Sequence, residues 1–200
     1  MTIILASKSP RRKYLLEKSN LNFKILESGF CENNNNTNIN RPSYYCKELA
    51  KLKSLEIAKN FPNDLVIGAD TIVYKEGIIY NKPKNKKEAI NHLKTLSDDT
   101  HTVYTGVSLI IKSKNIKLNF YEKTFVTFYK LNDTDINFYI DKYKPYDKAG
   151  AYGIQDWSMI FVKSINGCFN NVIGFPISKF YKLSSKNQIL NNAIKSNQIL

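Results

Sequence analysis

The sequence contains little cysteine and no long hydrophobic run. Its three cysteines, Cys31, Cys46 and Cys168, are odd in number, lie far apart and form no CxxC pair, so we expect neither a disulfide framework nor a zinc site. No apolar stretch approaches the roughly 18 residues that a membrane-spanning helix needs. The apolar run 3–6 is too short for a signal peptide. We therefore expect a cytoplasmic location and no membrane association.

Common nucleotide-binding and nucleic-acid-binding motifs are also absent. There is no GxxxxGK[ST] loop, and 150–155 does not match GxGxxG. The sequence lacks an RNP-type aromatic motif, a zinc finger and a clear helix-turn-helix, so nucleic acid is not the expected partner. A formal net charge of +13 nevertheless attracts anions of any kind. Charge alone does not choose between nucleic acid and a polyphosphate metabolite.

The pattern of apolar residues predicts an α/β fold. A chain of 200 residues with 42% hydrophobic residues fits one domain, 1–200, with a substantial core. The strands 103–112 and 116–131 indicate an antiparallel hairpin. Other predicted strands are 2–6, 23–26, 65–69, 159–165 and 72–80, the last with a turn at Glu76-Gly77, and loops are predicted over 28–42 and 166–176. Predicted helices start at Pro10 and span 43–60, 85–96, 134–141 and, as one or two helices, 177–196.

The apolar run 65–69 ends on the carboxylate of Asp70. An unbroken apolar run predicts a strand that is buried on both faces, in a parallel or mixed sheet. Asp70 would then lie at the carboxyl end of this strand, where open α/β sheets place their ligands. The alternative is that Asp70 only caps the next element.

A helix start that suits an anion follows the first predicted strand. Ser9 is the expected N-cap and Pro10 the first helical residue. The helix N-terminus, the hydroxyls of Ser7 and Ser9, and the guanidinium groups of Arg11 and Arg12 all suit phosphate oxygens. An exposed SPRR turn, as found in DNA minor-groove and kinase-site motifs, is the alternative.

Three lysines and two carboxylates could complete such a site. Lys53 lies beside the apolar row of its predicted helix and either points inward or snorkels to its edge. Lys82 precedes Pro83, and Lys148 lies near Gly150. Each alone is more commonly a solvated charge. Together with the two arginines, Glu32 and Asp70, they suit metal-assisted attack on a phosphoanhydride, because cations hold phosphates while carboxylates hold Mg²⁺ and deprotonate water.

The two histidines are weaker candidates for the base. His92 lies on a predicted surface helix and His101 in a predicted turn. Neither belongs to a set of residues with metal-ligand spacing. Asp70 is therefore the preferred base.

These residues lie in motifs that resemble those of the Maf family. Each motif is weak alone, but they follow the family's order over nearly the whole chain. The motifs are Ser7–Arg12, Glu48–Lys53, Ile67–Thr71, Lys82–Pro83, His101–Gly106, Asp147–Gln155 and Asn171–Pro176.

The resemblance implies a nucleoside triphosphate pyrophosphatase, which cuts the α–β phosphoanhydride with Mg²⁺ or Mn²⁺. It implies a mixed twisted sheet with flanking helices, in a two-lobed ITPase-like fold with a central cleft, and a possible homodimer. Asp70 would activate water and, with Glu32, hold the metal. The residues expected to contact phosphate or line the cleft are Ser7, Ser9, Arg11, Arg12, Lys53, Lys82, Asp147 and Lys148, of which Lys53 and Lys82 are expected to act in catalysis with Asp70.

Three positions resemble the branch of the family that acts on dTTP and UTP, namely Arg11, Thr71 and Gln155. The branch that acts on 7-methyl-GTP typically has an aromatic residue and Gln at the first two. We therefore expect dTTP, UTP and modified pyrimidine triphosphates as substrates. Asp156 and Trp157 depart from the family pattern beside Gln155. The alternatives are a pyrophosphatase for 7-methyl-GTP or another non-canonical nucleotide, a phosphatase that releases inorganic phosphate, and a non-enzymatic nucleic-acid-binding or cell-division regulator.

Overall fold

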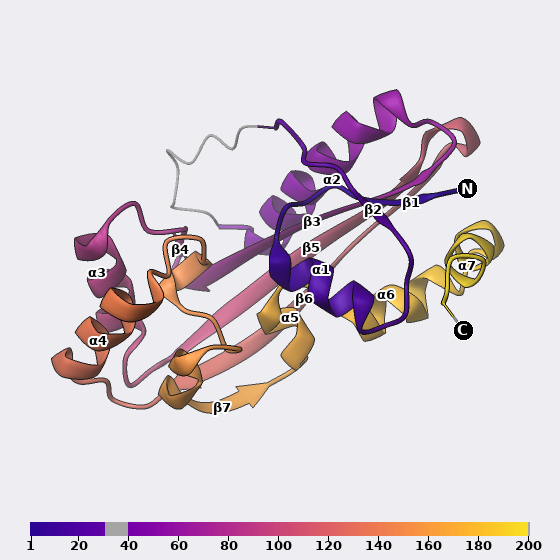
Figure 1. The fold of residues 1–200 in the computed structure, drawn as a ribbon. Helices are drawn as coiled ribbons and strands as arrows, with labels where there is room; N and C mark the ends of the chain where they lie inside the picture. The colour runs from indigo at the N-terminus through magenta and orange to yellow at the C-terminus, as the bar shows by residue number, and fades with distance from the viewer. Residues whose placement is uncertain (31–39, 200) are drawn as a thin grey trace.

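The computed structural model describes residues 1–30 and 40–199, which fold around a seven-stranded mixed β-sheet (Figure 1). The strand order is β2-β1-β3-β5-β6-β7, and β4 pairs with β3. The strands are β1 (Ile3–Leu5), β2 (Lys24–Ile25), β3 (Leu65–Lys75), β4 (Ile78–Tyr80), β5 (Thr100–Ile111), β6 (Ile116–Phe128) and β7 (Val162–Asn166). The α-helices are α1 (Pro10–Glu17), α2 (Pro42–Asn60), α3 (Lys86–Leu96), α4 (Asp133–Tyr143), α5 (Phe169–Ile173), α6 (Ile177–Ser184) and α7 (Gln188–Lys195).

The mixed character of the sheet comes from β1, which pairs in parallel with both β2 and β3. The remaining strand pairs are antiparallel, and the longest is β5 with β6, from Thr100↔Thr127 to Ile111↔Ile116. This pair confirms the predicted hairpin. Asn115 closes it in the left-handed region at φ 51°, a conformation that Asn tolerates better than most residues.

One edge of β3 is paired at both ends and open in the middle. Its residues 65–67 pair with β1 and residues 73–75 with β4, so no described strand covers 68–72 on that edge. Asp70 lies in this gap, in the middle of the strand. The prediction that Asp70 ends its strand is therefore wrong, because pairing with β5 along the opposite edge continues from Val66 to Tyr74. The gap after β1 gives Asp70 the access that a strand end would give.

Helix α2 lies directly on β3 and β5 because both strands carry glycine beneath it. A Cβ on Gly68 would lie 2.2 Å from the carbonyl oxygen of Ala50, and one on Gly106 would lie 2.3 Å from that of Cys46. Any side chain at these positions would displace the helix. The two glycines thus set the height of α2 above the sheet.

The core divides into two large clusters along the long strands. One cluster, which includes Leu16 and Phe180, lies under α1, α6 and α7. The other, which includes Leu93 and Tyr139, lies under α3 and α4. Figure 1 shows α3 and α4 at one end of the sheet and α6 and α7 toward the other, with α1 between them. The predicted two-lobed α/β fold is confirmed. No helix in the described ranges is long and apolar enough to span a membrane.

Two predictions near the C-terminus are wrong. The segment predicted as a strand over 159–165 starts as a 3₁₀ turn, Trp157–Phe161, and the strand covers only Val162–Asn166. The side chain of Asp156 caps this turn, and short apolar runs do not distinguish a turn from a strand. The predicted loop 166–176 contains α5. The terminal segment forms two helices, since Asn187 caps α7 separately.

Candidate active site

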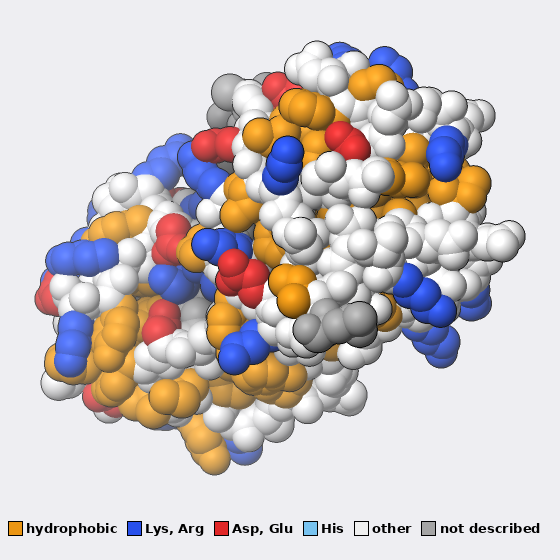
Figure 2. Space-filling view, turned by 45° about the vertical axis from the view of Figure 1, so that its right-hand side comes forward, with side chains coloured by type: hydrophobic (Ala, Val, Ile, Leu, Met, Phe, Trp, Pro, Cys, Tyr) orange, Lys and Arg blue, Asp and Glu red, His pale blue; other side chains and the backbone are white. Residues whose placement is uncertain are grey.

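A cleft opens between the two lobes, beside the gap in the edge of β3. Ten of the residues predicted from sequence line it, although they come from five separate parts of the chain. They are Ser9, Arg11, Arg12, Lys53, Asp70, Thr71, Lys82, Asp147, Lys148 and Gln155. Figure 2 shows basic and acidic side chains side by side around a hollow in the surface. Ser7 lines an adjoining pocket, whereas Glu32 lies outside the described residues.

The floor of the cleft holds an ion pair between Asp70 and Lys53. The Lys53 Nζ donates to Asp70 Oδ1 at 2.6 Å, and the two side chains are 16% and 8% exposed. Lys53 therefore points inward, toward the sheet. It can do so because α2 approaches the sheet closely at Gly68. A charge-assisted bond this well buried fixes both groups.

Arg12 ties three segments of the cleft wall together. Ser9 caps α1 as predicted, accepting from the Arg12 backbone N–H at 3.5 Å. The Arg12 guanidinium is buried and donates from Nη1 to Ser7 Oγ at 3.0 Å, and from Nε to the Gly174 carbonyl at 3.1 Å. Its Nη2 donates to Thr71 Oγ1 at 3.1 Å. The structure thus gives Arg12 a part in shaping the wall.

Thr71 faces this guanidinium and a polar network behind it. Its Oγ1 lies 3.0 Å from Thr105 Oγ1, which in turn donates to the Asn171 carbonyl at 3.1 Å. The hydroxyl of Thr71 is therefore engaged within the wall. A substitution of Thr71 would therefore act first on the position of Arg12 and only indirectly on a bound ligand.

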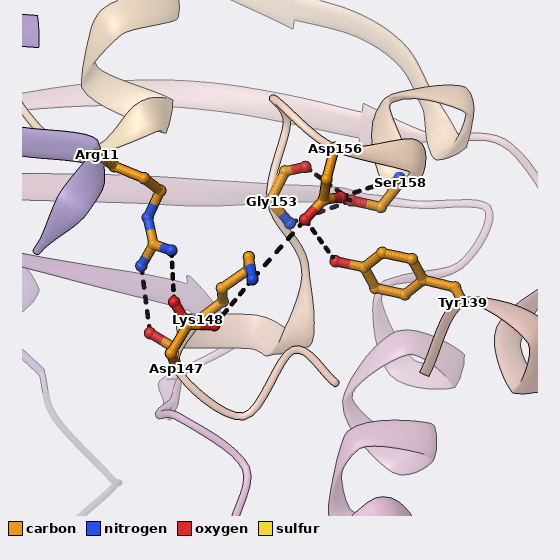
Figure 3. Close-up of polar contacts among 7 residues, drawn as sticks. All are labelled: Arg11, Tyr139, Asp147, Lys148, Gly153, Asp156 and Ser158. Carbon is orange, nitrogen blue, oxygen red and sulfur yellow. Dashed lines mark hydrogen bonds and ion pairs between the residues drawn. The ribbon is translucent and has the colours of Figure 1, made fainter. Parts of the chain in front are cut away.

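Across the cleft, the segment 147–156 meets α1 through ion pairs (Figure 3). Arg11 donates from Nη1 to Asp147 Oδ2 at 2.7 Å, and Lys148 Nζ donates to Asp147 Oδ1 at 2.8 Å. Partial burial raises the pKa of Asp147, but the hydrogen bonds from Lys148 and Arg11 outweigh it and hold the pKa below its usual range. Asp147 therefore stays ionised and links the two lobes.

Lys82 and Gln155 lie on the rim of the cleft, and both are exposed. The buried Pro83 fixes the backbone next to Lys82. Gln155 also borders a shallow pocket against α1 and α5. Both side chains are free to meet a ligand that enters the cleft.

The expectation that His101 lies in a turn is wrong. His101 lies in β5, which begins earlier than predicted because Thr100 pairs with Thr127. The imidazole is 1% exposed and its Nε2 lies 2.8 Å from the Tyr152 hydroxyl. Burial lowers the pKa of His101 to about 3, so the ring is neutral. Neither His101 nor His92 lines the cleft.

Sequence reasoning missed three residues that shape the cleft. The carbonyl of Gly174 accepts from Arg12 Nε, and the φ of 127° at this residue favours glycine. The available signal in the sequence was its place in a family motif. Tyr152 lines the cleft, and its hydroxyl is hydrogen-bonded to His101, 51 residues away in the sequence. The sequence carries no local signal for this contact. Asp156, noted only as a departure from the family, lies behind Lys148.

The cleft fits part of a divalent metal site. Within residues 1–30 and 40–199, no group of three His, Cys, Asp or Glu side chains could hold a metal. Mg²⁺, however, is commonly bound by one or two carboxylates together with substrate phosphates. Asp70, on the cleft floor, supplies one such carboxylate.

The fold and the cleft define an α/β protein in which a buried aspartate–lysine pair is surrounded by cationic side chains. The chain belongs to the Maf family, whose sequence model, described as Maf-like protein, matches residues 2–187. It is 47% identical over 183 residues to the dTTP/UTP pyrophosphatase of Thermosipho melanesiensis, covering 92% of this chain and 96% of that one. It is 41% identical over 203 residues to the dTTP/UTP pyrophosphatase of Cytophaga hutchinsonii, covering 98% and 88%. Among solved structures, the Staphylococcus aureus Ham1 protein matches with a TM-score of 0.44 and 18% identity, covering 64% of this chain and 72% of that one.

Proposed function

We propose that this protein hydrolyses dTTP and UTP, including modified pyrimidine forms, to the nucleoside monophosphate and pyrophosphate. The observation that carries the proposal is the Asp70–Lys53 pair, buried on the floor of a cationic cleft where the edge of β3 is open. The names of the relatives, dTTP/UTP pyrophosphatase, support the choice of substrate. We also propose a single-domain, cytoplasmic homodimer, which fractionation and light scattering would test.

Asp70 is the proposed base. A water molecule beside its carboxylate attacks the α-phosphorus, the bond between this phosphorus and the bridging oxygen breaks, and Asp70 receives the proton of the water. Lys53 holds Asp70 Oδ1 at 2.6 Å, so the carboxylate is oriented before the nucleotide arrives. Pyrophosphate then leaves with the bridging oxygen.

The cations around the floor neutralise the charge that develops on the phosphates. Lys82 lines both the cleft and the adjoining pocket next to Ser7 and Ser9, so a triphosphate can extend from one into the other. Asp70 and, in this proposal, Glu32 would hold Mg²⁺ or Mn²⁺, which would supply further charge neutralisation.

The proposed specificity residues act from different places. Arg11 and Gln155 lie at the rim, where they would contact the nucleobase of the substrate directly. Thr71 acts through Arg12, since its hydroxyl accepts from that guanidinium. The proposal therefore assigns the choice of nucleotide to the rim and, through Arg12, to the wall, and the reaction to the floor.

A panel of nucleoside triphosphates tests this function. Purified protein is incubated with dTTP, UTP, modified pyrimidine triphosphates, 7-methyl-GTP and ATP, and pyrophosphate is measured with and without EDTA. We expect pyrophosphate from dTTP and UTP, with loss of activity in EDTA. A preference for 7-methyl-GTP would overturn the substrate assignment. Activity that EDTA leaves unchanged would overturn the proposed metal requirement.

A further inference from the structure

Lys148 lies between two carboxylates on the cleft wall. Its Nζ is 2.8 Å from Asp147 Oδ1 and 3.7 Å from Asp156 Oδ2 (Figure 3). The Lys148 side chain is only 15% exposed, so little of its four-carbon stem is free in water. Its ammonium is therefore held from both sides.

Gly153 makes room for this arrangement. A Cβ at Gly153 would lie 2.8 Å from Lys148 Cε and 2.9 Å from Asp156 Oδ2. The lysine stem thus crosses the glycine to reach Asp156, and a side chain at this position would force the two apart.

Asp156 is itself fixed by buried partners. Its Oδ1 accepts from the Ser158 backbone N–H at 3.1 Å and lies 2.8 Å from Ser158 Oγ. Its Oδ2 accepts from the Tyr139 hydroxyl at 3.2 Å. Ser158 and Tyr139 are both fully buried, and burial raises the pKa of Tyr139, so its hydroxyl remains a donor.

The two carboxylates around Lys148 therefore differ in rigidity. The Asp147 side chain is 53% exposed and is shared with Arg11, whereas that of Asp156 is 22% exposed and anchored to the core of one lobe. Removing Asp156 would leave Lys148 tied only to the exposed carboxylate. The Lys148 side chain would then populate more rotamers, and nucleotide binding would have to restrict them at a cost in conformational entropy.

We propose that Asp156 is a positioning residue, which holds Lys148 in place for nucleotide binding. The inference rests on the proposed function and takes Lys148, which lines the cleft, as a residue that contacts the nucleotide there. Asp156 touches no substrate in this account. Its effect on affinity passes entirely through Lys148.

The first test is Asp156→Asn, assayed with dTTP. The amide keeps an acceptor for the Ser158 N–H, so the turn folds, and thermal unfolding checks this. We expect KM to rise about three- to tenfold, the order expected for restricting the rotamers of one long side chain again, with kcat changed less than about twofold.

Asp133→Asn is the matched control. It makes the same charge change and breaks the Lys94–Asp133 pair (2.7 Å) outside the cleft, and its KM should match the wild type. An unchanged KM in Asp156→Asn, or an equal rise in Asp133→Asn, overturns the proposal.

The second test is a double-mutant cycle with Lys148→Met. If Asp156 acts through Lys148, Asp156→Asn should add nothing to the KM of Lys148→Met. Independent, additive effects would show that Asp156 acts elsewhere and overturn the proposal.

If the wild type releases no pyrophosphate, the proposed function fails. The same four proteins are then compared by calorimetry with dTTP in EDTA. Non-additive binding there supports the positioning role, and additive or unchanged binding overturns it.

Discussion

The floor of the cleft is built from buried groups on a strand and a helix, whereas its rim is built from half-exposed ion pairs. On the floor, Asp70 and Lys53 are held by β3 and α2 at a height set by glycine. At the rim, Arg11 and Asp147 join the lobes through side chains that are 25% and 53% exposed. Groups on packed elements keep a fixed geometry, and exposed pairs can rearrange around different ligands. This difference supports the proposal that the floor carries out the chemistry and that the rim selects the nucleotide.

The largest expected effect comes from Asp70→Asn. The amide keeps the shape of the floor but cannot take a proton, so kcat should fall about 10²- to 10⁴-fold. Binding of dTTP, measured by calorimetry, should change by less than about threefold. Asp141→Asn, which removes an exposed partner of Lys86 outside the cleft, is the control. Retained turnover in Asp70→Asn would refute the role of the floor.

Gly68→Ala tests whether close packing holds the floor in place. Because the new methyl would lie 2.2 Å from the Ala50 carbonyl, we expect the free energy of unfolding to fall by about 3 kcal/mol in urea denaturation. Gly29→Ala is the comparison, since its Cβ meets only the flexible Glu56 side chain at 3.1 Å. Wild-type stability in Gly68→Ala would mean that α2 is not held as described.

The pH dependence of stability tests the burial of His101, whose imidazole contacts the cleft residue Tyr152. Burial lowers the pKa of His101 to about 3, below the roughly 6.5 of the unfolded chain. The unfolded state therefore binds more protons between these values, so stability falls as pH falls from about 6.5 toward 3. From pH 7.5 to 5 the loss should reach about 2 kcal/mol.

His101→Gln should remove much of this loss, as measured by urea denaturation at both pH values. Part of the dependence should remain, because burial also lowers the pKa of His92. An unchanged pH dependence in the variant would contradict the assignment to His101.

The smallest effect on stability is expected for Arg11→Ala at the rim. Its pair with Asp147 is partly exposed, so unfolding should change by less than about 1 kcal/mol. The ratio of kcat/KM for dTTP to that for 7-methyl-GTP should shift by about tenfold. Lys13→Ala, on the same helix and paired with Glu17 at 3.6 Å, is the control. A fall by one common factor for all nucleotides would refute a specificity role.

Local signals in the sequence predicted much of the fold. Ser9 and Pro10 predicted the start of α1, and Asn85 begins the predicted helix as the cap of α3. The β5–β6 hairpin followed from two long apolar segments around a turn. These features depend on residues close in sequence, so one sequence suffices.

The features that sequence missed depend on contacts between distant segments. The position of Asp70 within β3 is set by pairing with β5, and the burial of His101 by pairing with β6. Periodicity left two directions open for Lys53, and the approach of α2 at Gly68 and Gly106 decides between them. Such packing is not encoded in any short stretch.

The products formed from dTTP test the central claim most directly. Phosphorus NMR of the reaction distinguishes dTMP and pyrophosphate from dTDP and inorganic phosphate. We predict that wild-type protein forms dTMP and pyrophosphate in equal amounts and that Asp70→Asn forms neither above background. Formation of dTDP and inorganic phosphate, or equal turnover by the variant, would contradict the account.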